Sequence, residues 1–240
     1  MARALDALRS DEQQRSWAER LPAAKRRFRE IFPGGFRDPT YLEWERDYKW
    51  AAHVAWQRTL DRRTWARLLA IGAHRDIAAR IAGWYAKSKL NMLALYEWMA
   101  LREALADATG ARLLSAALYD LIHGADLFER RLERFTLVLD RVPQRQTRLA
   151  KWPVATLFPF VARPATHLIL KPMVTKRAAE RLGFELAYAS RPNAHTYAAM
   201  IGYVSWLRHA LVAWRPRDLI DLQGFLWVTC SEEYEDWPWE

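Results

Sequence analysis

The stretch NAHTYAAMIGYVSWLRHALVAW, residues 193–214, decides the fold class. Its apolar side chains recur at helical spacing and form one stripe, which consists of Tyr203, Trp206, Leu207, Ala210, Leu211 and Trp214. Asn193 is a favoured N-cap residue, and Pro216 cannot continue a helix. The stretch therefore predicts an amphipathic helix that must bury its apolar face against other elements.

The same spacing recurs over most of the chain, in which glycine and proline are sparse. We expect helices over residues 40–60, 64–71, 74–87, 88–108, 111–122, 126–139, 145–161 and 172–183, and a last helix that Asp218 caps. Pro153 and Pro159 should kink or split the helix of residues 145–161. Residues 166–170 are the only candidate strand. The sequence thus predicts an all-α, multi-helical globular bundle.

Three regions follow from this pattern. Residues 1–35 form an N-terminal helical arm, either mobile or packed as an outer helix, that ends at Pro33-Gly34-Gly35. Residues 36–140 form a helical region, and residues 141–240 form a basic region. The second and third regions could also make one domain.

Composition limits the class of protein. The chain has 240 residues, is 51% hydrophobic and carries a formal net charge of +9, while residues 231–240 hold five acidic and no basic side chains. Cys230 is the only cysteine, so no intrachain disulfide is possible. No apolar run is long enough for a membrane span, and the first residues lack the apolar core of a signal peptide. These features predict a cytoplasmic protein without a membrane partner; the oligomeric state stays open.

The charge is concentrated in one segment. Between Val142 and Ala179 there are seven basic residues and no acidic one, and planar side chains are interleaved with them. Basic groups with planar groups are typical of a surface that binds a phosphate backbone, although an arginine-rich coding bias gives the same charge without a ligand. We therefore expect a nucleic-acid partner, with DNA favoured. The predicted contacts are Arg145, Arg148, Lys151, Trp152, Lys171, Lys176 and Arg177.

Part of this region resembles the helix-hairpin-helix DNA glycosylase superfamily. The resemblance rests on WPVAT (152–156), FVARP (160–164) and VTKRAAERLG (174–183), and on the later order Tyr197, Arg208, Asp218, Asp221 and Trp227. It implies a helix-hairpin-helix-like C-terminal half. The family hairpin places glycines against a phosphate, whereas RLAKWP (148–153) has none, so Arg148, Lys151 and Lys176 would have to bind through side chains.

The whole chain also resembles an uncharacterised family of bacterial proteins. The residues that carry this are YLEWERDYKWAA (41–52), Lys171-Pro172 with Val174-Thr175, Pro192-Asn193 with Thr196-Tyr197, and PRDLIDLQ (216–223) with FLWV (225–228). Ala194 and Gly224 depart from the tryptophan and serine expected at their positions. This resemblance bears on the fold more than on the function.

Asp218 and Asp221 are the candidate catalytic residues. A glycosylase needs a carboxylate that stabilises an oxocarbenium-like centre or activates water, and these two would share a helix face. The alternative function is therefore a divergent base-excision glycosylase in which Trp152 or Trp227 stacks on the extruded base. The more ordinary roles are an N-cap for Asp218 and a buried arginine partner for Asp221.

Other polar groups have structural explanations that we favour. The turns Arg163-Pro-Ala-Thr-His167 and Arg191-Pro-Asn-Ala-His195 could flank a phosphodiester but are typical of loops. Glu43, Glu45 and Asp47 could bind a cation but also suit i, i+4 ion pairs, and Glu97 on an apolar stripe needs a partner. No metal spacing and no Gly-rich nucleotide loop is present, so we expect no metal and no cofactor. A third possibility is a protein-interaction scaffold whose arginines pair internally.

Overall fold

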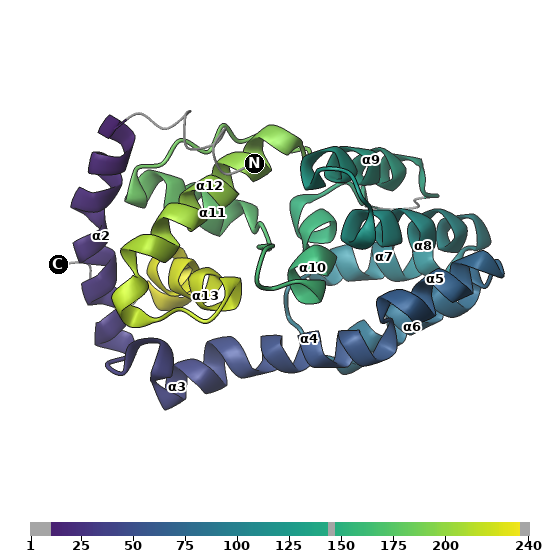
Figure 1. The fold of residues 1–240 in the computed structure, drawn as a ribbon, viewed down its shortest axis with the longest axis horizontal. Helices are drawn as coiled ribbons and strands as arrows, with labels where there is room; N and C mark the ends of the chain where they lie inside the picture. Colours follow the sequence, from purple (N-terminus) through teal and green to yellow (C-terminus); the bar gives the residue numbers. More distant parts are fainter. Residues whose placement is uncertain (1–10, 144–146, 236–240) are drawn as a thin grey trace.

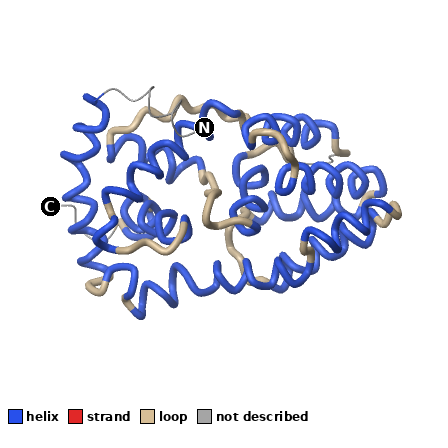
Figure 2. The backbone as a smooth tube through the Cα atoms, in the orientation of Figure 1, coloured by secondary structure: helices blue, strands red, loops and turns tan. Residues whose placement is uncertain are grey.

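The computed structural model describes residues 11–143 and 147–235, and every regular element in these ranges is helical. Figure 2 shows the helices joined by loops, without a strand in the described part of the chain. The all-α prediction is therefore confirmed. The longer helices are α2 (Asp11–Ile31), α4 (Asp47–Thr59), α5 (Arg62–Ala70), α6 (His74–Lys87), α7 (Leu95–Ala106), α8 (Ala108–His123), α9 (Phe128–Arg141), α10 (Trp152–Ala162), α11 (Pro172–Leu182), α12 (Ala194–Ala210) and α13 (Leu219–Cys230).

Short elements link these helices. They are the 3₁₀ turns η1 (Gly35–Arg37), η3 (Val212–Trp214) and η4 (Glu232–Tyr234), the single turn α3 (Pro39–Tyr41), and the π-helical segment η2 (Leu42–Arg46). None of the described helices has the length and apolarity needed to cross a membrane.

The helices pack around two apolar clusters that lie at opposite ends of an elongated molecule (Figure 1). The first cluster is built mainly from α4 to α10. The second is built mainly from α2, α11, α12 and α13, and α4 runs along one side of the molecule from the second cluster into the first. Tyr188 and Ile201 pack against both clusters, so the two are continuous.

Helix α10 lies near the centre of the molecule, and all of its side chains are buried. It begins at Trp152, later than predicted, because Pro153 suits the first turn of a helix. Pro159 lies inside the helix and does not split it. The buried hydroxyl of Thr156 donates to the Trp152 carbonyl at 2.6 Å and accepts from the Leu170 amide at 2.9 Å. Residues 166–170 are therefore held against α10 as an irregular segment, and the one candidate strand is not formed.

The described part of the N-terminal region is an outer helix that packs on the second cluster. Phe28 of α2 and Phe32, which directly follows this helix, are fully buried. The Phe28 ring contacts the rings of Tyr41 and Phe225 at 5.5 Å between centroids. Residues 1–10 lie outside the described residues. Of the two possibilities for this region, the structure shows the packed helix from Asp11 onward.

Two helix predictions are corrected. The helix expected over 40–60 contains the π-helical segment η2, which directs Glu45 and Arg46 inward and leaves Trp44 55% exposed. The helix expected over 88–108 begins only at Leu95, because the Glu97 carboxylate accepts from the Ala94 amide at 2.9 Å and fixes the first turn there. Residues 88–94 form turns instead, and Lys89 has a positive φ of 53°.

Candidate functional site

Two arginines of the basic segment pair with acidic side chains. Arg148 pairs with Asp140 of α9 at 3.0 Å, and Arg177 of α11 pairs with Glu232 at 2.6 Å and Glu235 at 2.7 Å. These partners lie outside the acid-free segment in sequence but beside it in space. The acidic C-terminal residues thus compensate part of the charge that the sequence places in this segment.

The other residues predicted to bind nucleic acid have varied surroundings. Trp152 is 1% exposed and donates its indole N–H to the Ala189 carbonyl at 2.7 Å. Lys151 lies over the Tyr96 ring at 4.3 Å, and Lys176 lies over the Tyr188 ring at 5.1 Å. Lys171 donates to the Met92 carbonyl at 2.9 Å. Arg145 lies outside the described residues.

A second group of basic residues was missed by the sequence reasoning. Five arginines at the end of α4, on α5 and at the start of α6 are exposed, and no ion pair with any described residue is found for them. We call this group the α5 basic surface; it consists of Arg58, Arg62, Arg63, Arg67 and Arg75. The nearby carboxylates are already used, since Asp61 caps α5 and Asp76 pairs with Arg80 at 3.1 Å. The sequence contained a signal for this group, because Arg62 and Arg63 directly precede the helix predicted over 64–71 and Arg75 lies in the first turn of the helix predicted over 74–87.

Arg163 extends this positive region. Its Nη2 lies 3.4 Å from Nδ1 of His123, which is also near Arg62. Burial, together with charge repulsion from Arg163, Arg62 and Arg131, lowers the pKa of His123 to about 4. Three arginines therefore contribute positive charge near His123, while burial is the larger cause of its lowered pKa.

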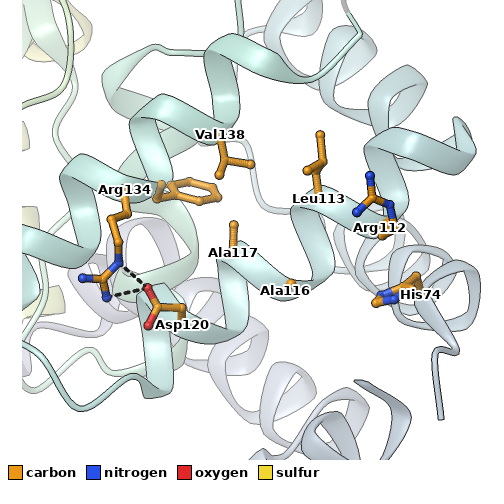
Figure 3. Close-up of a pocket in the computed structure, with 9 residues that line it drawn as sticks. His74, Arg112, Leu113, Ala116, Ala117, Asp120, Arg134 and Val138 are labelled. Atoms are coloured by element: carbon orange, nitrogen blue, oxygen red, sulfur yellow. Dashed lines mark hydrogen bonds and ion pairs between the residues drawn. The ribbon is translucent and has the colours of Figure 1, made fainter. Parts of the chain in front are cut away.

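A surface groove of about 460 Å³ lies along α8 and α9 and reaches His74 at the start of α6 (Figure 3). Leu113, Ala117 and Val138 of α8 and α9 give it an apolar floor, and the Asp120–Arg134 pair lies at one end. His74, which directly precedes Arg75, and Arg112 lie toward the other end. The groove therefore combines an apolar floor with cationic and polar edges.

Asp218, the N-cap of α13, and Asp221, in its first turn, belong to a buried network of charged side chains. Arg46 of η2 donates to Asp218 at 2.7 and 2.8 Å and to Asp221 at 2.9 Å. Asp221 is fully buried and also accepts from the Tyr41 hydroxyl at 3.0 Å and from the Arg217 side chain at 3.0 Å. The N-cap role of Asp218 and the arginine pairing of Asp221 are both confirmed. Burial and the charge of Asp221 raise the pKa of Tyr41 well above its ordinary value, so its hydroxyl remains a donor.

A second buried ion pair, between Glu45 and Lys49, lies beside this network. Lys49 donates to Glu45 at 2.8 Å, and the Tyr234 hydroxyl donates to the other Glu45 oxygen at 2.8 Å. The expected i, i+4 ion pairing is therefore confirmed for Glu45. This ion pair is buried, whereas the sequence predicted a solvated one. The Tyr234–Glu45 hydrogen bond joins η4 to η2, and the Lys49–Glu45 pair joins η2 to α4.

The two Arg-Pro-x-x-His turns do not form matching sites. His167 is buried, and burial lowers its pKa to about 3, with Arg131 and Arg163 adding repulsion. Arg191 pairs with Asp140 at 2.7 Å, while His195 is exposed. Within residues 11–143 and 147–235 no group of three or more His, Cys, Asp or Glu side chains is arranged to hold a metal ion.

Comparisons of the chain with protein-family models, with curated proteins and with solved structures find no match.

Proposed function

We propose that this protein binds nucleic acid, with DNA favoured, and that the α5 basic surface makes the principal phosphate contacts. The observation that carries the proposal is the group of five exposed arginines for which the described part of the chain supplies no acidic partner. A phosphate backbone would supply the missing charges and release its counterions. The groove that reaches His74, the residue before Arg75, gives an apolar recess suited to an unpaired base.

The positions of these arginines support a ligand rather than intramolecular stability. Arg62 and Arg63 stand in the first turn of α5, and Arg75 stands in the first turn of α6. Cations at a helix N-terminus oppose the helix dipole, and neighbouring like charges repel each other. An anion bound at these two helix starts would remove both penalties, because N-termini favour negative charge.

The helix-hairpin-helix resemblance remains a separate hypothesis about where the nucleic acid lies. It places the contacts at Arg148, Lys151, Lys176 and Arg177, two of which have carboxylate partners. The two surfaces are tested against each other by matched variants that each remove four positive charges. One is Arg62/Arg63/Arg67/Arg75→Ala, and the other is Arg148/Lys151/Lys176/Arg177→Ala.

The measurement is fluorescence anisotropy with labelled single-stranded and duplex DNA over a salt series. We expect the first variant to lose most of the affinity and the second to lose little. The slope of log affinity against log salt should fall by roughly 0.9 for each duplex phosphate contact removed. Equal losses would show a general effect of net charge, and a loss confined to the second variant would favour the helix-hairpin-helix surface. Absence of binding by the wild-type protein at low salt would overturn the proposal.

A further inference from the structure

Trp50 presents an indole ring to solvent on α4, the helix that leads to α5. The residue is 44% exposed. A single exposed tryptophan is not by itself a binding site, and Trp44 of η2 is 55% exposed as well. Trp50 is distinguished by the side chains that hold its ring and by the charges that lie beyond it along the helix.

The Trp50 ring is held by two neighbours that are themselves fixed. The His53 ring lies 4.9 Å from it between centroids, and Nδ1 of His53 is 2.7 Å from the Val161 carbonyl oxygen. The Arg46 guanidinium lies 5.6 Å from the centre of the Trp50 ring, and this arginine is buried and bound to Asp218. A ring that is already positioned loses little conformational entropy when a planar partner stacks on it.

The exposed charges of α4 differ in sign on the two sides of Trp50. Asp47 is exposed and precedes Trp50 by three residues. Arg58 is exposed and follows it by eight residues, which is about 12 Å along the helix axis. Arg62 and Arg63 come next, at the start of α5. A strand with a base on Trp50 would therefore find positive charge for its phosphates toward α5, and negative charge in the opposite direction.

The end of α10 places a further positive charge beside this path. Gln57, about two turns after the exposed indole on the same face of α4, donates to the Ala162 carbonyl at 2.8 Å. Arg163 follows Ala162 directly and is exposed. Its Nη2 lies 3.4 Å from Nδ1 of His123, and Arg62 is close enough to His123 to repel its protonated form. Arg163 thus connects this face of α4 with the α5 basic surface.

We propose that Trp50 is a stacking platform for an unpaired base, and that the ligand of the α5 basic surface is single-stranded DNA. This inference rests on the proposed nucleic-acid function and specifies its ligand. An exposed ring can stack on the free face of an unpaired base, whereas the bases of a duplex are already stacked on one another. The arginines beyond the ring would hold the phosphates of the same strand.

The test measures fluorescence anisotropy of a labelled thymidine oligonucleotide, as a single strand and as a duplex, with the full chain at fixed salt. We expect Trp50→Ala to weaken single-strand binding by roughly five- to a hundredfold, the value of one stacked base, and to leave duplex binding unchanged. Trp44→Ala is the matched control and should leave both affinities unchanged. Trp50→Phe should retain most of the single-strand affinity and Trp50→Leu should lose it, and this pair decides the question if Trp50→Ala fails to fold.

An abasic single strand of the same length makes the test specific to stacking. It keeps the phosphates but lacks the bases, so Trp50→Ala should bind it as tightly as the wild type does. Equal losses on the abasic and intact strands, or an unchanged affinity of Trp50→Ala for the intact strand, would overturn the platform. If Arg62/Arg63/Arg67/Arg75→Ala still loses binding in that case, the proposed function stands and the platform alone fails. A wild-type protein that binds none of these strands would overturn both.

Discussion

Asp221 shows how a candidate catalytic residue is used when it lies inside the protein. Its carboxylate is fully buried and accepts from Tyr41, Arg46 and Arg217, so every strong donor nearby is directed at it. Burying a carboxylate is costly unless it is paired and hydrogen-bonded, and here both conditions are met. The sequence allowed this partnership but could not identify Arg46, which precedes Asp221 by 175 positions.

We expect Asp221→Asn to lower the free energy of unfolding by about 3 kcal/mol, because Arg46 and Arg217 would lose a buried negative partner. Urea denaturation at pH 7.5 measures this. Asp76→Asn is the matched control, since the exposed Asp76–Arg80 pair should contribute about 0.5 kcal/mol or less. An Asp221→Asn protein as stable as the wild type, but without base release from damaged DNA, would instead favour the glycosylase alternative.

His167 should make the protein sensitive to mild acid. Its folded-state pKa is about 3 because of burial and the nearby arginines, against about 6.5 when unfolded. The unfolded state therefore binds more protons below pH 6.5, and stability falls as the pH is lowered from there toward 3. The slope from one such group is roughly 1.4 kcal/mol per pH unit. His167→Gln should flatten the stability curve between pH 6 and 4.5, whereas replacing the exposed His195 by glutamine should not.

Some helix boundaries are determined by capping residues close in sequence, and others by contacts with distant parts of the chain. Asn193, Asp218 and Gly183 define helix ends as predicted, because a side-chain cap or a left-handed glycine acts within a few residues. The π-helical segment η2 was not predictable from spacing, since it depends on turning Glu45 and Arg46 toward α13 and η4. The surroundings of the basic segment were not predictable either. The segment itself contains no acidic residue, but Asp140, Glu232 and Glu235 of neighbouring elements pair with its arginines.

Thr156 links α10 to the irregular segment beside it, and its hydroxyl both donates and accepts. Thr156→Val would leave the buried Leu170 amide without a partner, so we expect a loss of about 1–3 kcal/mol in the free energy of unfolding. Thr229→Val is the control, because the Thr229 hydroxyl donates to the Phe225 carbonyl of its own helix and accepts from no backbone amide in the described chain. Its loss should be smaller in the same urea experiment. Similar losses in the two variants would contradict the linking role.

The molecule as a whole should unfold as one cooperative unit, although its apolar side chains form two clusters. Arg46 ties the start of α4 to α13 in the second cluster, and Trp56 at the other end of α4 is buried in the first. Tyr188 and Ile201 contact both clusters. A domain boundary near residue 140, one of the two possibilities that the sequence left open, would separate helices that are in contact, because α9 before it contacts α12 after it.

We therefore expect tryptophan fluorescence and far-ultraviolet circular dichroism to report the same urea midpoint. Phe28→Ala in the second cluster and Trp65→Ala in the first should each cost about 3–5 kcal/mol, because both side chains are fully buried. Each variant should shift the whole transition, whichever cluster it affects. Two separate transitions, with each substitution moving only one, would show that the clusters are independent domains.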